Sequence, residues 1–142
     1  MAAAPFNWNE FLNLANTLSG NGDEASHRTS ISRAYYAAFH AATDHAKANG
    51  YNERSHGRLW KMYGGDADIN AKRLSAIGNF LKRQREQADY ATAVPRVNDI
   101  MTQQLAETAN FMTTLALVPA TSPQLLPPNP KKTCPSCGAV VP

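Results

Sequence analysis

The sequence predicts an all-α fold, a bundle of four or five helices followed by a proline-rich tail. Apolar side chains recur at helical spacing in several segments of the first 117 residues. No segment shows the convincing alternation of apolar and polar residues that indicates a strand. Seven of the nine prolines lie beyond residue 118, where they remove backbone donors that a helix needs. A helical domain over residues 1–117 is therefore expected to precede a tail without helices.

The first two predicted helices span residues 6–19 and 23–49. Asn7 can cap the first helix, and Glu10 follows three residues later in a pattern like a capping box. The sequence SGNG ends this helix, and Gly50 ends the second. The expected apolar faces are Trp8, Phe11, Leu12, Ala15 and Leu18 on the first helix, and Ile31, Tyr35, Ala38, Phe39, Ala42 and Ala46 on the second.

Three further helices are predicted over residues 55–63, 69–90 and 95–117. The loop GGDAD separates the first two of these, and Pro95 suits the first turn of the last. Their apolar faces are expected to contain Leu59, Trp60 and Tyr63, then Leu74, Ile77, Leu81 and Ala88, then Val97, Met101, Leu105, Met112 and Leu115. Helices of this number and length form a bundle.

The composition is that of an ordinary globular protein. Of the 142 residues, 43% are hydrophobic and 18% are charged, which excludes a disordered or membrane-embedded chain. No apolar run approaches the ~20 residues of a transmembrane helix, and the N-terminus lacks the basic start and apolar stretch of a secretory signal. We expect a cytoplasmic protein with no membrane partner.

The net charge of +3 permits an anionic partner without requiring one. Basic residues cluster in two places, one before and within the third predicted helix and one on the fourth. Two interpretations stay open, a nucleic-acid-binding surface and a solvated helix surface. For the first interpretation, the candidate RNA-binding residues are Arg54, Arg58, Lys82 and Arg83.

The tail divides into an extended linker over residues 118–132 and a small terminal unit over residues 133–142. The terminal unit contains TCPSCGAVV, in which Cys134 and Cys137 have the spacing of half a zinc knuckle. Structural zinc takes four ligands, so two more must come from a second copy, a partner, or His27 or His56. The motif can also be a remnant or a docking tag. A redox pair is disfavoured because no βαβ pattern surrounds it.

The segment SRAYYAAFH places an arginine, a tyrosine and a histidine with candidate catalytic roles on the second predicted helix. Seven residues make about two turns, so Arg33, Tyr36 and His40 share a face that differs from the face of Tyr35 and Phe39. Histidine can exchange a proton with the 2′-hydroxyl or the leaving oxygen of RNA, and a guanidinium can stabilise charge on the phosphate. Neither role needs a metal. The segment therefore indicates metal-independent RNA cleavage.

Spacing also predicts a homodimer. Arg33 and His40 are about 10 Å apart along the axis, and the arginine side chain leans toward the N-terminus, away from the histidine. Two such helices that meet across a twofold axis would bring each arginine near the other chain's histidine. The alternative is structural: Arg33 pairs with Asp44 or Asp89, and His40 is a hydrogen-bonded, half-buried residue.

Three segments in order, SRAYYAAFHAA, SHGRLWKMY and LKRQREQADY, resemble the HEPN superfamily, most of all its small prokaryotic members. The resemblance covers about residues 23–117. It implies a helical bundle that is often dimeric, and an endoribonuclease that acts as a toxin or in antiphage defence. It also implies a nucleotidyltransferase-type antitoxin or a larger defence complex as partner. It places the active site where the second helix meets the fourth, with Arg85, Asp89 and Tyr90 opposite Arg33, Tyr36 and His40.

The sequence departs from the family motif of an arginine followed, after four to six residues, by a histidine on a late helix. Tyr90 stands where that histidine would be, and no histidine follows His56. Arg85 and Asp89 are four residues apart and can pair, either to orient the site or to stabilise the helix. Tyr90 can donate to a phosphate or close the core with its hydroxyl at the edge. Two other functions stay open: a non-catalytic module that binds nucleotide, RNA or a protein, and a scaffold subunit of a larger complex.

Overall fold

The computed structural model describes residues 4–52, 54–119, 132–133 and 140–141. The all-helical bundle is confirmed. Five helices make up the bundle: α1 (Asn9–Ser19), α2 (Glu24–Ala48), α3 (His56–Gly64), α4 (Ile69–Tyr90) and α5 (Val97–Leu115). In the tail, the two-residue strands β1 (Lys132–Thr133) and β2 (Val140–Val141) pair antiparallel, with Lys132 opposite Val141.

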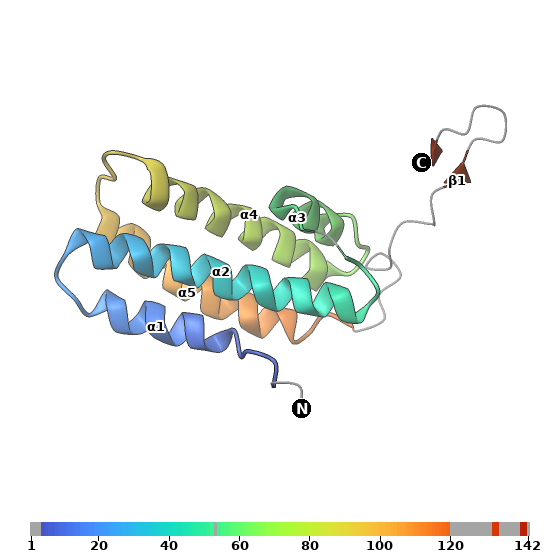
Figure 1. Cartoon of the computed structure of the whole chain (residues 1–142), viewed down its shortest axis with the longest axis horizontal. Helices are drawn as coiled ribbons and strands as arrows, with labels where there is room; N and C mark the ends of the chain where they lie inside the picture. Colours follow the sequence, from blue (N-terminus) through green and yellow to red (C-terminus); the bar gives the residue numbers. More distant parts are fainter. Residues whose placement is uncertain (1–3, 53, 120–131, 134–139, 142) are drawn as a thin grey trace.

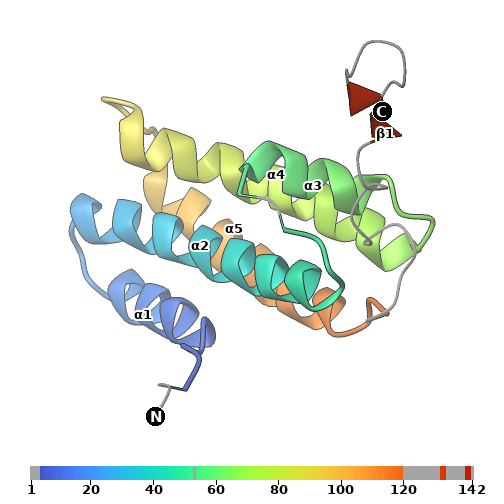
Figure 2. The same cartoon turned by 45° about the vertical axis from the view of Figure 1, so that its right-hand side comes forward.

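Helix α2 is the central element of the bundle. It packs against α1, α4 and α5, while the short α3 packs on α4. Figures 1 and 2 show α1 and α4 running in one direction along the bundle and α2 and α5 in the other. The long central helix therefore contacts three neighbours around its circumference. Part of its surface lies between α1 and α4.

The core is built around Trp60, which is fully buried together with Tyr35, Tyr63 and Phe111. Alanines of α2 let the neighbouring helices come close, and Ala34, Ala37, Ala38 and Ala42 have no exposed surface. Gly78 allows an equally close approach of α4 to α3, because a Cβ atom there would lie 2.5 Å from the Trp60 ring. Small residues thus set the helix spacing around one large indole.

Side-chain caps fix the starts of the three middle helices. The carboxylate of Asp23 accepts from the backbone N–H of Ser26 at α2, and that of Asp68 accepts from Ala71 at α4. Ser55 does the same for α3. Each cap satisfies a backbone donor that has no partner within its helix.

Two predicted helix starts were wrong by a few residues. Helix α1 begins at Asn9 rather than at residue 6, and Asn7 accepts from the backbone N–H of Asn9 without forming the expected capping box. Helix α5 begins at Val97, so Pro95 lies in the turn before it, and Arg96 adopts a left-handed φ of 58°. Propensity indicates that a helix exists more reliably than it indicates its first residue.

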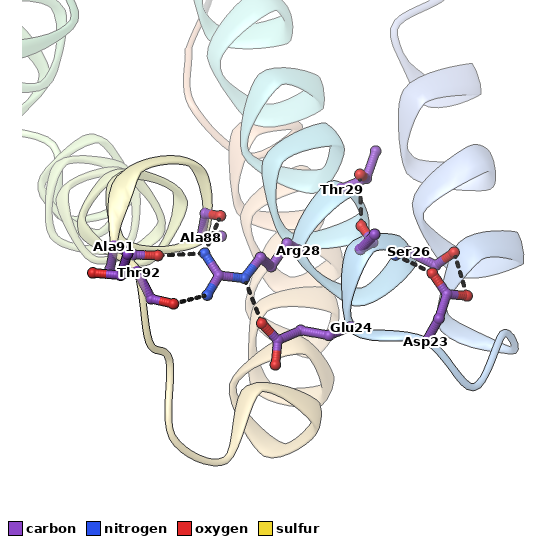
Figure 3. A network of polar contacts seen from close by, with 9 residues as sticks. Asp23, Glu24, Ser26, Arg28, Thr29, Ala88, Ala91 and Thr92 are labelled. Carbon is purple, nitrogen blue, oxygen red and sulfur yellow. Dashed lines mark hydrogen bonds and ion pairs between the residues drawn. The ribbon is translucent and has the colours of Figure 1, made fainter.

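Arg28 joins the start of α2 to the end of α4. Its guanidinium donates to the carbonyl oxygens of Ala88, Ala91 and Thr92, at 3.1, 2.6 and 3.4 Å, and to the Glu24 carboxylate at 2.9 Å (Figure 3). The last carbonyls of a helix have no partner within it, so a cation there also opposes the negative end of the helix dipole. This contact anchors the C-terminal part of α4 against α2.

The bundle's buried contacts extend to Val118, which is 6% exposed and packs in the core. This residue was predicted to begin the linker. Within the described part of the chain, no helix combines the length and the apolar character that crossing a membrane requires.

Candidate functional site

An open cavity of about 540 Å³ lies where α1, α2 and α4 meet. Its wall contains all six residues that the sequence predicted for a catalytic site. The lining residues are Trp8, Phe11, Thr29, Ser32, Arg33, Tyr36, His40, Arg85, Asp89 and Tyr90. The fold therefore brings together predicted side chains that lie up to 57 positions apart in the sequence, the separation of Arg33 and Tyr90, and it adds Trp8 from further away in the chain.

Two guanidinium groups stand in this cavity, each against aromatic rings. The Arg33 guanidinium carbon lies 4.9 Å from the ring centre of Phe11 and 5.1 Å from that of Tyr36. The Arg85 guanidinium carbon lies 5.5 Å from the ring centre of the same Tyr36. All three distances are within the range of cation–π attraction. The Tyr36 ring therefore contacts both guanidinium groups, that of Arg33 and that of Arg85.

Arg85 is partly neutralised by Asp89. Their closest N···O distance is 3.5 Å, and the Asp89 carboxylate also accepts from the Ser32 hydroxyl at 3.2 Å. Burial alone would lower the pKa of Arg85, but Tyr36 and Asp89 outweigh it and leave that pKa raised. The Nε atom of Arg85 is buried without a hydrogen-bond partner among the described residues. The predicted Arg85–Asp89 pair is confirmed, and Arg85 keeps an unused donor.

Tyr90 lies at the rim and is 78% exposed. It does not close the core, which was one of the two roles predicted for it. Its ring lies 5.9 Å from the Arg85 guanidinium carbon. A hydrogen bond from the Arg85 guanidinium to the Tyr90 side chain adds to the raised pKa of Arg85, so Tyr90 contacts this arginine at the edge of the cavity.

His40 is covered on one side by Trp8. The two rings stack with centroids 3.9 Å apart and planes 16° from parallel. Burial lowers the pKa of His40; the charge of Asp44 opposes this shift, and those of Arg33 and Lys47 add to it. The imidazole is consequently neutral at pH 7, in the form that can accept a proton.

A single chain brings these side chains together, because α4 of the same protomer contributes to the cavity and Tyr36 lies between Arg33 and His40. The homodimer expected from the spacing of Arg33 and His40 stays a prediction. The expected pairing of Arg33 with Asp44 or Asp89 is wrong. Among the described residues, no carboxylate lies within 4.0 Å of its guanidinium, since Asp44 accepts from Trp8 and Asp89 pairs with Arg85.

His56 lies behind the cavity in a chain of buried hydrogen bonds. The indole N–H of Trp60 donates to the Tyr35 hydroxyl at 3.2 Å, and that hydroxyl contacts Nδ1 of His56 at 2.6 Å. A neutral His56 ring with an unprotonated Nδ1 can accept from the Tyr35 hydroxyl. Burial lowers the pKa of His56, and Arg85 adds to the effect. The partners of His56 are thus a tyrosine hydroxyl and the Phe39 ring, whose centre lies 3.8 Å away, which gives this histidine a structural role.

The four candidate RNA-binding residues do not form one cluster with the cavity. Lys82 pairs with Glu86 at 3.5 Å on the surface of α4, and Arg83 is exposed beside it. Arg58 is exposed on α3, and Arg54 lines a separate cavity next to His40.

The predicted zinc ligands Cys134 and Cys137 lie outside the described residues. Among the described residues, no three His, Cys, Asp or Glu side chains come together to hold a metal ion. His27 and His56 were named as additional ligands, and each already has a partner. The Nε2 atom of His27 lies 2.6 Å from the carbonyl oxygen of Asn21, and His56 contacts Tyr35.

Four of the ten lining residues were not among the predicted site residues: Trp8, Phe11, Thr29 and Ser32. Trp8 and Phe11 were placed on the apolar face of the first helix, which is correct, but the face covers His40 and Arg33 rather than core residues alone. A tryptophan and a phenylalanine three residues apart carry no signal for a site. Their place in the site follows from their contacts with His40 and Arg33 on the next helix, and these contacts depend on how the two helices pack.

Comparison with family models, with curated proteins and with solved structures gives no significant match. The resemblance to the HEPN superfamily therefore rests on the three sequence segments that carry it.

Proposed function

We propose that this protein is a HEPN-type, metal-independent endoribonuclease whose active site is the cavity between α1, α2 and α4. One observation carries the proposal: two guanidinium groups and a neutral histidine line a single open cavity. Guanidinium groups bind phosphate oxygens with paired hydrogen bonds, and neutral imidazole is a general base near pH 7.

The proposed reaction uses the RNA's own 2′-hydroxyl as the nucleophile. His40 takes the proton of this hydroxyl, and the oxygen attacks the adjacent phosphorus. The bond from phosphorus to the 5′-oxygen breaks, and that oxygen takes a proton from water. The products are a 2′,3′-cyclic phosphate and a 5′-hydroxyl. Arg33 and Arg85 stabilise the negative charge that builds on the phosphate oxygens during attack.

A second function, binding of RNA or nucleotide without cleavage, is favoured by two other contacts. Asp89 already shares the charge of Arg85, and Trp8 covers one face of His40. The first contact reduces the charge that Arg85 offers to a transition state, and the second limits access to the imidazole that would take the proton. In that case the same cavity holds a phosphate group while the strand stays intact.

The remaining parts of the proposal come from the resemblance and the tail. They are a toxin or antiphage defence role, a homodimer, a nucleotidyltransferase-type antitoxin or a larger defence complex, and a structural zinc ion at Cys134 and Cys137. Zinc per chain, measured before and after replacement of both cysteines, tests the last of these. A wild-type protein without zinc would contradict it.

The nuclease is tested by incubating RNA with the purified protein in EDTA. We expect wild type to cut and His40→Ala and Arg33→Ala to lose at least about a hundredfold in rate, the usual scale of a general base. Arg73→Ala and His27→Ala are matched controls, because both positions lie outside the cavity lining. Intact RNA with wild type, or equal cutting by the His40 variant, would contradict cleavage. Retained RNA binding in that case would support the binding function.

A further inference from the structure

A second cavity lies on the other side of His40 from Arg33. It has a volume of about 450 Å³ and is lined by Phe39, His40, Thr43, Lys47, Asn52 and Arg54. His40 lines both cavities, so they adjoin at its imidazole. None of the other residues of the second cavity belongs to the site described above. The second cavity therefore extends the first one along α2 toward the helix C-terminus.

Arg33, His40 and Lys47 follow one another at seven-residue intervals on α2. Two turns of helix take about 7.2 residues, so each step drifts by only about 20° and the three side chains share one stripe. The stripe is about 21 Å long at 1.5 Å per residue. A single phosphate group at Arg33 therefore does not reach Lys47.

The electrostatics of His40 show that Lys47 belongs to its surroundings. Positive charge on both Arg33 and Lys47 contributes to the lowered pKa of His40, so a cation acts on the imidazole from each direction along the helix. Asp44, the carboxylate that acts on the pKa of His40, accepts from the indole N–H of Trp8 at 2.9 Å. Among the described residues that line the second cavity, none is acidic.

We propose that the second cavity is a binding subsite for the continuation of a single RNA strand, with one phosphate held at Arg33 and a later phosphate of the same strand at Lys47. The Asn52 side chain, which can donate and accept hydrogen bonds, lines the same cavity and suits the edge of an unpaired base. The strand crosses His40 between the two phosphates. The inference rests on the proposed function for the first cavity and extends it, because it selects an RNA strand over a mononucleotide.

The test measures binding of 2′-O-methyl RNA, which lacks the nucleophile and is not cleaved. Ligands are a mononucleotide, a dinucleotide and a longer oligonucleotide that reaches from Arg33 to Lys47. We expect Lys47→Ala to weaken binding of the oligonucleotide severalfold and to leave the mononucleotide unaffected. The slope of log affinity against log salt should fall by about 0.7, the contribution of one neutralised phosphate on a single strand. Asn52→Ala should weaken only the oligonucleotide, with no change in that slope.

Arg73→Ala is the matched control, because it removes a positive charge from exposed surface outside both cavities. Unchanged oligonucleotide affinity and salt slope in Lys47→Ala, with a clear loss in Arg33→Ala, would overturn the subsite and leave the first cavity in place. Equal, Lys47-dependent binding of inorganic polyphosphate would overturn the choice of an RNA strand. If Lys47→Ala weakens oligonucleotide binding while wild type leaves unmodified RNA intact, the result would support the subsite and contradict the nuclease.

Discussion

The imidazole of His40 lies flat against the indole of Trp8, with ring centroids 3.9 Å apart. The indole is itself fixed, because its N–H donates to the Asp44 carboxylate on the same helix as His40. Residues just before α1 thereby control how much water reaches the candidate general base on α2. Stacking removes water from one face of the imidazole and so disfavours its charged form.

Trp8→Ala is expected to raise the pKa of His40 toward its usual value of 6.5, because burial is the main cause of the lowered pKa. Release of Asp44 from the indole should act in the same direction. The measurement is an NMR titration of the His40 ring protons. Trp8→Phe keeps an aromatic ring and should raise the pKa less. An unchanged His40 pKa in Trp8→Ala would show that the stacking does not control it.

Acidification is expected to lower the free energy of unfolding just below pH 6.5. Burial lowers the pKa values of His40, His45 and His56 in the folded protein from their usual 6.5. Below that pH the unfolded chain binds protons that the folded protein does not, so stability present at pH 7 is lost as the pH falls. Urea unfolding across this range measures the effect.

Replacement of a single histidine isolates its share of this pH dependence. His56→Gln keeps an acceptor for the Tyr35 hydroxyl and removes the titrating group. When the pH falls from 7 to below 6.5, the free energy of unfolding should decrease less in this variant than in wild type. An identical pH dependence in both proteins would mean that His56 titrates alike in the folded and unfolded states.

Gly78→Ala is expected to destabilise the fold by about 1–3 kcal/mol, the typical cost of an overpacked core. The new methyl group would lie 2.5 Å from the Trp60 ring, which is fully buried and hydrogen-bonded to Tyr35. Gly57→Ala is the matched control in α3, where a Cβ atom meets nothing within 4 Å. Because alanine favours a helix over glycine, the control should leave stability unchanged or raise it by up to about 1 kcal/mol. Denaturant midpoints compare the two, and equal effects would argue against close packing at Gly78.

Arg28→Ala should destabilise the protein by about 1–3 kcal/mol, since it leaves carbonyl groups at the end of α4 without their donor. The control Arg73→Ala removes an exposed arginine from α4 and should change the free energy of unfolding by less than about 0.5 kcal/mol. Hydrogen exchange near residues 88–92 localises the effect. Global destabilisation with no faster exchange there would contradict a cap on α4.

The helices themselves could be predicted from the sequence because their signals are local. Three side-chain caps, the glycine stop after α2 and the apolar repeats all act within a few residues of one another. The errors lie at the starts of α1 and α5, where no side chain of the expected residue caps the helix. There the start depends on how the loop packs, which sequence spacing does not encode.

The candidate site was predictable in part, for a similar reason. The shared face of Arg33, Tyr36 and His40 follows from helical geometry, and the pairing of Arg85 with Asp89 follows from their spacing of four. Their placement opposite one another came from the resemblance to a family. In the structure, α4 of the same chain brings Arg85, Asp89 and Tyr90 to the cavity, and the expected second chain stays a prediction.

The sequence by itself predicted four or five helices, their approximate bounds and the two faces of α2. These depend on interactions between residues that are close along the chain. Only the tertiary structure decided that Trp8 covers His40, that Arg33 has no acidic partner among the described residues, and that two cavities meet at one imidazole. Such features arise when helices distant in sequence pack together, and packing depends on the shape of the whole bundle rather than on any one segment.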